Sequence, residues 1–374
     1  MSRYQPFATS AIQLGDLAER DCDLWSRRVA EVAAPEVPFD DHGLAAVAAS
    51  VIDARRNERA VLLMLGGHPI KLGLSRFLID LIERGFVSCI ATNGAGLIHD
   101  FELAFHGGTS EDVARWIRVG QFGLWRQTGQ LNDIVSEAAR RGEGFGEGLG
   151  RTIEEGRSRS SLPERTGASG DDLRVGDSTG AFDFAGDDPA RQAGSTFPFA
   201  DLSVAAAGWR CGVPVTCHVS IGSDIIHGYP NCDGAALGQV SHTDFLIFAR
   251  QIQKLEGGVF LNVGSAVTGP EVYLKALSMA RNVAQQQGEE IRHFTTAVFD
   301  VVELPENWKD GPGPRPQGQV GGQEGQQKPH PLYYYRPWKT ILCRTVEDGG
   351  ESYYICGDHR DTIPTLWHHL VNGA

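Results

Sequence analysis

Residues 60–69, AVLLMLGGHP, decide the fold class that the sequence predicts. The first six are an uninterrupted apolar run, which is typical of a strand buried on both faces of a sheet. Two glycines end the run, and apolar residues from Leu72 to Ile82 then recur at helical spacing as far as Gly85. A second apolar run, Phe86 to Ala91, closes in residues 92–96, TNGAG. Strand, glycine turn, helix and strand in this order predict a parallel sheet.

Further along the chain, similar patterns extend this unit. Helices are predicted at 44–55, 241–255, 271–283 and 364–371, with a capping box at Thr109–Asp112 opening another as far as Ile117. Strands are predicted at 213–220, 258–262, 294–299, 340–344 and 352–356. Stretches 142–196 and 305–331 are rich in Gly, Pro and polar residues and predict an irregular insertion and a loop. We therefore expect one doubly wound, mostly parallel α/β domain over residues 1–374.

Composition narrows the class of partner. The net charge of −13 argues against nucleic acid or an anionic membrane surface, because either partner requires clustered Lys and Arg. We see no signal peptide and no apolar run of 18 residues, so we expect a soluble cytoplasmic protein. Seven scattered cysteines without a CxxC pair indicate reduced thiols and no zinc site. An acidic chain suits a cationic amine substrate, although acidity also serves solubility.

Small and polar residues at the ends of predicted strands indicate a ligand crevice. In open α/β sheets, ligands bind at the carboxyl ends of the strands, where glycine lets the backbone approach a phosphate. No complete GxGxxG is present, and each glycine could also serve only to turn the chain. The strand ends in question are Gly66-Gly67-His68, Asn93-Gly94-Ala95-Gly96, residues 220–224, residues 263–265 and residues 295–297.

Two clusters of polar residues and one lysine are further candidates for binding or catalysis. His99, Asp100 and Glu102 could bind a ribose, a cationic amine or a metal, or could simply cap a helix. The pair Asp224 and His227 has roughly helical spacing and is more often structural than metal-binding.

The chain has six lysines, and Lys339 follows an aromatic run, YYYRPW, at 333–338. Desolvation among aromatic rings would make its amine a nucleophile for carbonyls and imines; the alternative is a surface cation–π contact.

These motifs resemble deoxyhypusine synthase. The resemblance begins with residues 61–100, including Ile70-Lys71-Leu72-Gly73 and the turn at 92–96. It resumes at Gly212-Val213-Pro214-Val215 and leads to Asp224. Its later motifs, in the order of the family, are residues 257–261, 280–282, 295–297 and Trp338-Lys339-Thr340-Ile341.

The resemblance implies a Rossmann-like fold and an NAD-dependent transfer of an aminobutyl group from a polyamine such as spermidine. The acceptor would be a small diamine or a protein lysine. Lys339 would form the Schiff base, and Asp224, His227 and Trp338 would contact the substrate. The family also implies a homotetramer, with active sites shared across a dimer interface. The NAD contacts would be Gly66, Gly67, His68, Asn93, Gly94, Ala95, Asp100, Gly264, Thr296, Ala297 and Asp358.

Several positions depart from the family pattern. Trp338 and Lys339 are adjacent, whereas the family separates them by a glycine, and no carboxylate stands just ahead of the lysine. The family's histidine base is missing from residues 269–273, where Glu271 or Tyr273 could replace it only by position. Two alternatives therefore stand beside the transferase: a non-catalytic NAD- or polyamine-binding protein, and an NAD-dependent amine dehydrogenase.

Overall fold

A parallel sheet of six strands forms the centre of the computed structural model, which describes residues 3–158, 196–312 and 330–373. The predicted α/β class with a parallel sheet is confirmed. In spatial order the strands are β5 (Val215–His218), β3 (Cys89–Asn93), β2 (Val61–Leu65), β6 (Val259–Val263), β7 (Thr295–Asp300) and β8 (Glu351–Cys356).

The order of the strands locates a switch point. From β2 the chain adds β3 and β5 on one side, and then returns to add β6, β7 and β8 on the other side. The direction of winding therefore reverses between β2 and β6, which pair in parallel from Val61↔Val259 to Leu65↔Val263. Open α/β sheets bind ligands in the crevice outside the carboxyl ends of such strands.

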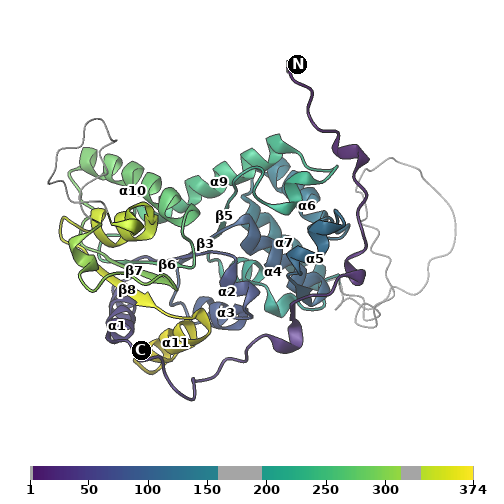
Figure 1. Cartoon of the computed structure of the whole chain (residues 1–374). Helices are drawn as coiled ribbons and strands as arrows, with labels where there is room; N and C mark the ends of the chain where they lie inside the picture. The colour runs from purple at the N-terminus through teal and green to yellow at the C-terminus, as the bar shows by residue number, and fades with distance from the viewer. Residues whose placement is uncertain (1–2, 159–195, 313–329, 374) are drawn as a thin grey trace, which may run out of the picture.

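Helices cover both faces of the sheet (Figure 1). Residues alternate along each strand, so that Val61 and Leu63 face one apolar core and Leu62 and Met64 face the other. The first core includes α1 (His42–Arg56), α3 (Ser75–Glu83), α4 (Gly94–His106), α6 (Gln130–Arg141), α7 (Phe145–Ser158), α8 (Val204–Cys211) and α11 (His359–Gly373). The second core includes α10 (Thr268–Gln287) and the C-terminal half of α9 (Gly234–Ile252).

Shorter elements complete the described chain. Helices α2 (His68–Lys71) and α5 (Val113–Arg118) follow β2 and β4 (Gly108–Thr109), and β4 pairs antiparallel with β1 (Leu24–Trp25). Single 3-10 turns lie at Thr9–Ala11, Leu17–Glu19, Ser26–Arg28, Ala200–Leu202, Ile225–Gly228, Trp308–Asp310 and Pro331–Tyr334. Within the described ranges, no helix combines the length and apolarity that a membrane crossing needs.

The strand predicted at 340–344 is wrong. Residues Pro337–Arg344 form a π-helical segment, labelled η10, which lies over β7 and β8 on the side of α10. Six consecutive residues of this segment, 337–342, are buried. A short buried run has the same composition in a helix as in a strand, so the sequence pattern did not distinguish the two.

The irregular insertion predicted at 142–196 begins with a helix instead. Helix α7 buries Phe145, Leu149 and Ile153, spaced by four. Its glycines suggested a loop, but they allow close packing: a Cβ at Gly146 would overlap the carbonyl oxygen of Val215 in β5. Residues 159–195, and residues 313–329 of the second predicted loop, lie outside the described part of the chain.

Helix starts also differ from the predictions. The cap of α5 is Asp112, whose side chain accepts a hydrogen bond from the Arg115 amide at 3.0 Å, so Thr109 does not open this helix. Helix α9 begins at Gly234, seven residues before the predicted start at 241, because Asp233 caps it. The sequence patterns did not predict α4, α6 or α8.

Candidate functional site

The carboxyl edge of the sheet brings together most of the predicted ligand positions. Gly66, Gly67 and His68 follow β2, and Gly264 follows β6 on the other side of the switch point. Asn93, Gly94 and Ala95 follow β3, Asp224 and His227 follow β5, and Asp358 follows β8.

The two glycine turns at the switch point are packed against each other. A Cβ at Gly66 would overlap the carbonyl oxygen of Gly264, so any side chain there would push the ends of β2 and β6 apart. Gly264 has φ +63°, and a Cβ there would lie 2.7 Å from Nε2 of His359. Packing alone thus requires glycine at both positions. Gly67 is half-exposed and packs against Ala95 and the His99 ring of α4.

The N-terminus of α4 is occupied by the protein's own side chains. Oδ1 of Asn93 accepts the Gly96 N–H at 3.0 Å, and the Asp224 carboxylate accepts the Ala95 N–H. A Cβ at Gly94 would overlap that carboxylate. Asp224 therefore takes the place that an anionic ligand group would otherwise use. Burial raises its pKa to about 6, although the Ala95 hydrogen bond opposes the rise.

Asp224 and His227 form a close but incompletely bonded pair. Nδ1 of His227 accepts hydrogen bonds from the backbone amides of Gly222 at 3.0 Å and Asp224 at 3.2 Å. The proton of the neutral ring is therefore on Nε2, which lies 3.8 Å from Oδ2 of Asp224, too far for a hydrogen bond. Both atoms are buried and have no partner among the described residues.

The polar atoms at this edge of the sheet show whether it suits a bound dinucleotide. Buried polar atoms usually have partners, yet Oδ1 of Asn262 in β6 and Nδ1 of His359 after β8 have none within the described ranges. Together with the exposed backbone at Gly67, these atoms fit a polar ligand at the switch point. The α4 N-terminus does not fit a phosphate while Asp224 occupies it.

Three of the predicted NAD contacts lie elsewhere. Thr296 and Ala297 are fully buried near the amino end of β7, where the Thr296 hydroxyl donates to the Ile341 carbonyl at 3.1 Å. Asp100 is also fully buried, and both of its oxygens cap α8, which begins after Ser203. It accepts hydrogen bonds from the Ser203 hydroxyl at 2.6 Å and from the amides of Val204 at 2.7 Å and Ala205 at 3.2 Å.

Asp358 does lie at the carboxyl edge, but it is paired locally. The Arg360 guanidinium donates to its carboxylate at 2.6 and 3.0 Å. These hydrogen bonds lower the pKa of Asp358 to about 2.

Lys339 lies in η10, away from the switch point. Two to three strand spacings, about 10–14 Å, separate β2 from β7 and β8, over which η10 packs. The residue is 7% exposed, and its Nζ lies 4.2 Å from the centroid of the Tyr333 ring and 5.7 Å from that of Tyr334. The predicted aromatic surroundings are present, and the contact includes the cation–π geometry of the alternative interpretation.

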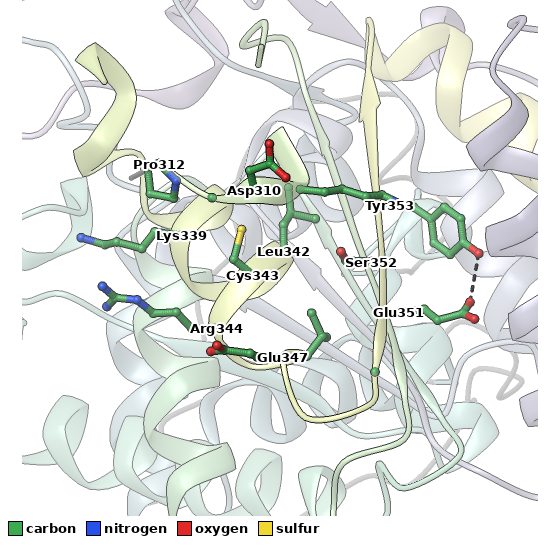
Figure 2. Close-up of a pocket in the computed structure, with 14 residues that line it drawn as sticks. Asp310, Pro312, Lys339, Leu342, Cys343, Arg344, Glu347, Glu351, Ser352 and Tyr353 are labelled. Atoms are coloured by element: carbon green, nitrogen blue, oxygen red, sulfur yellow. Dashed lines mark hydrogen bonds between the residues drawn. The ribbon is translucent and has the colours of Figure 1, made fainter. Parts of the chain in front are cut away.

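A cavity of about 660 Å³ adjoins Lys339 between η10, residues 309–312 and the outer edge of β8. Lys339 and Arg344 extend to the same side from η10, and Glu351 lies on the far side of the cavity, where it accepts a hydrogen bond from Tyr353 at 3.0 Å (Figure 2). The charged lining residues are Lys309, Asp310, Lys339, Arg344, Glu347 and Glu351. Three carboxylates and three cationic side chains thus line this cavity.

Glu271 and Trp338 have structural partners. Glu271 opens α10 and pairs with Lys275 and Arg336, which lower its pKa and make it a weak base. Trp338 is buried, and its Nε1 donates to the Trp308 carbonyl at 2.7 Å. Tyr273, the other residue considered for the base, is buried against Phe260 and donates to Thr345 at 3.1 Å.

The cluster at 99–102 separates into different environments. Glu102 forms a buried two-bond ion pair with Arg20, at 2.8 and 2.9 Å, and accepts hydrogen bonds from Thr109 and Thr128. His99 contacts the Thr109 hydroxyl through Nδ1 at 2.8 Å. No group of three or more His, Cys, Asp or Glu suited to a metal ion occurs in the described ranges.

Sequence reasoning missed Asp300 and His359. Asp300 ends β7 and accepts a hydrogen bond from Tyr335 at 2.6 Å, and His359 opens α11 beside Gly264. The sequence signal was their position at or shortly after the carboxyl ends of predicted strands.

The fold and its carboxyl-edge residues define a doubly wound α/β protein with a candidate ligand crevice at the β2/β6 switch point. No protein-family model and no curated protein match the chain. Among solved structures, it is similar at 13% identity and a TM-score of 0.45 to ArgZ, an arginine dihydrolase from cyanobacteria. A ternary complex of AgrE with ornithine and NAD+ is similar at 12% identity and a TM-score of 0.42.

Both matches cover 90% of this chain, which spans about a third of the length of those chains, 33% and 34%. A candidate deoxyhypusine synthase from Entamoeba histolytica is similar at 10% identity and a TM-score of 0.36, over 88% of each chain. At these values the likeness is a distant one of fold and does not establish membership in a family.

Proposed function

We propose that this chain is an enzyme of amine chemistry that moves an aminobutyl group from a polyamine such as spermidine through a Schiff base on Lys339. One observation carries the proposal: Lys339, a buried lysine whose amine lies over the Tyr333 ring, lines a cavity together with three carboxylates.

The cavity residues would have different roles in this reaction. Asp310, Glu347 and Glu351 would bind the distant ammonium groups of the polyamine by charge. The Lys339 amine would attack the carbon of a substrate imine, and the amine that leaves would take the proton that the nitrogen of Lys339 gives up. A second amine, from a small diamine or a protein lysine, would then displace Lys339 in the same way.

When bound, NAD would supply hydride transfer in both directions, taking a hydride from the substrate amine to leave an imine and returning it to the imine formed with the acceptor amine, so that the product carries a saturated aminobutyl group. Gly66, Gly67, His68 and Gly264 would hold it at the switch point, with Asn262 and His359 providing unpartnered polar atoms. Within one chain this crevice and Lys339 lie apart. We therefore also propose a homo-oligomer, a tetramer built as a dimer of dimers, in which the crevice of one subunit faces the lysine of another.

Borohydride trapping tests the proposal. The protein is incubated with NAD and spermidine, and in parallel with putrescine, then reduced, digested and mapped by mass spectrometry. We expect an aminobutyl adduct on Lys339 that disappears in Lys339→Ala and Lys339→Arg.

Lys309 lines the same cavity and provides the matched control, since Lys309→Ala should leave the adduct in place. Full transferase activity in Lys339→Arg would exclude the Schiff-base function. Light scattering of the wild-type protein tests the tetramer.

Two features favour the alternatives. The Asp224 carboxylate occupies the N-terminus of α4, and Glu271 is held in ion pairs that lower its pKa; both observations suit a non-catalytic NAD- or polyamine-binding protein. An amine-dependent rise in bound NADH absorbance would exclude that alternative. Consumption of NAD in proportion to the amine would instead identify an amine dehydrogenase.

A further inference from the structure

His99 stands at the side of the switch-point crevice. It lies in α4, and a Cβ at Gly67 would be only 3.4 Å from its Cδ2 atom. The ring is half-buried, and within the described part of the chain Nδ1 bonds to Thr109 whereas Nε2 bonds to no residue. The edge of the ring that carries Cδ2 and Nε2 therefore lies beside the glycine turn that follows β2.

The hydrogen bonds behind His99 fix its tautomer. The Thr109 hydroxyl has a single proton, which it donates to Oε2 of Glu102 at 2.6 Å. Burial would raise the pKa of Glu102, but Arg20 outweighs it and lowers the pKa, so this carboxylate is ionised and can only accept. The hydroxyl must therefore accept from Nδ1–H of His99, at 2.8 Å. Nε2 keeps its lone pair.

Burial keeps the ring neutral. Burial lowers the pKa of His99 to about 4, with Lys71, Arg20 and His68 also lowering it and Glu102 raising it. The charge of Glu102 is already balanced by Arg20, at 2.8 and 2.9 Å. Thr109 is itself fixed, because it pairs with Leu24 between β4 and β1. Nε2 is thus a fixed hydrogen-bond acceptor at neutral pH.

We propose that Nε2 of His99 accepts a hydrogen bond from the hydroxyl of an anionic ligand bound beside Gly67, with Lys71 supplying the opposite charge. The uncharged acceptor selects a donor such as a hydroxyl, and the half-buried lysine of α2 selects an anion. A ribose phosphate and a hydroxycarboxylate share this chemistry. Thr109 and Glu102 act through His99 and are positioning residues. The site lies apart from Lys339 and does not depend on the Schiff-base function.

Nitrogen-15 NMR of histidine-labelled protein tests the tautomer, with His99 assigned by comparison with His99→Gln. We expect a protonated Nδ1 and a bare Nε2 whose shifts stay constant from pH 8 to about pH 5, while exposed histidines titrate. A His99 that carries its proton on Nε2, or that titrates near pH 6.5, would overturn the proposal.

Two probes then test the ligand. Ribose 5-phosphate and lactate are titrated separately, and we expect at least one to shift the Nε2 resonance in a saturable way. A response to ribose 5-phosphate alone identifies a nucleotide-type ligand, and a response to lactate alone identifies a hydroxycarboxylate. No shift with either probe would overturn the proposed ligand.

Matched variants separate this role from a structural one. Thr109→Val should allow the proton of the His99 ring to move to Nε2 and should weaken binding of the responding probe about 10-fold. Thr109→Ser should keep the proton on Nδ1 and leave the binding of the probe unchanged. Lys71→Met should weaken binding by a similar factor, and Lys254→Met, at an exposed position away from the crevice, should not. Unchanged binding in Lys71→Met would overturn the assignment even if Thr109→Val fails to fold.

Discussion

Replacing Arg20 by methionine should destabilise the protein strongly at neutral pH. Arg20 and Glu102 are 3% and 1% exposed, and two hydrogen bonds join them, at 2.8 and 2.9 Å. Removing one partner of such a buried pair leaves an uncompensated charge, which costs about 3–5 kcal/mol. Because typical domains are stable by about 5–15 kcal/mol, this loss should be a large part of the free energy of unfolding.

Urea denaturation at several pH values measures the effect and its sign. In the wild type the pKa of Glu102 is lowered, so the stability from the pair is present above pH 4.5 and is lost as the pH falls through the lower native pKa. In Arg20→Met, burial and the charge of the neighbouring Glu111 oppose ionisation of Glu102, against the threonine hydroxyls and a weaker effect of His99, and we expect the pKa to rise above its unfolded value. The variant should then lose stability as the pH rises through that pKa. The difference from wild type should therefore begin to shrink as the pH falls below that raised pKa, and should shrink further below pH 4.5.

Two controls define the result. Arg84→Met, which breaks a partly exposed pair with Asp80, should cost less than about 1 kcal/mol. Arg20→Met combined with Glu102→Met removes both charges and should recover much of the loss. A loss below about 1 kcal/mol in Arg20→Met, or one that is constant from pH 7 to pH 4, would refute the reasoning.

Three further predictions concern packing and burial. Gly146→Ala should destabilise the protein by about 2 kcal/mol or more in thermal unfolding, because the new methyl group on α7 overlaps β5. Gly238→Ala is the control: nothing lies within 4 Å of the new methyl group, so it should stabilise the protein by up to about 1 kcal/mol through the helix propensity of α9. Burial raises the pKa of Asp244 to about 7, so its stability contribution is complete below pH 3.8 and is lost as the pH rises towards 7. Asp244→Asn should flatten the pH profile of unfolding over that range, and an unchanged slope would contradict this. Trp338→Phe should lower the free energy of unfolding by about 1 kcal/mol through loss of the hydrogen bond to the Trp308 carbonyl, in addition to the loss from the smaller buried apolar area. An unchanged denaturation midpoint would show that this bond contributes nothing.

Local patterns were sufficient where the structure depends on neighbours in sequence. The run at 60–65 and the glycines after it predicted β2 and its turn, because a strand buried on both faces must be apolar throughout. The same reasoning failed at 340–344, where a short apolar segment covers the sheet as a helix. It failed again at Gly146, where glycine serves close packing against β5 and not a loop.

Candidate residues were found more readily than their partners. The sequence placed Asp100 and Asp224 near a glycine turn, but only the structure shows Asp100 capping α8 and Asp224 capping α4. It identified Lys339 and its aromatic run, but not the cavity carboxylates at 310, 347 and 351. His99 was singled out, while the role of Thr109 and Arg20 behind it depends on contacts across the fold.

The sequence by itself determined the alternation of buried strands and helices, and with it a parallel sheet whose glycine turns lie at one edge. That information is local, because hydrophobic periodicity and turn chemistry act over a few residues. The tertiary structure decided which polar groups are engaged, as with Arg20 and Glu102, which are 82 positions apart. It also decided that Lys339 and the switch point are separate sites. Both outcomes depend on which distant surfaces are buried together, since burial and opposite charge act through space and not along the chain.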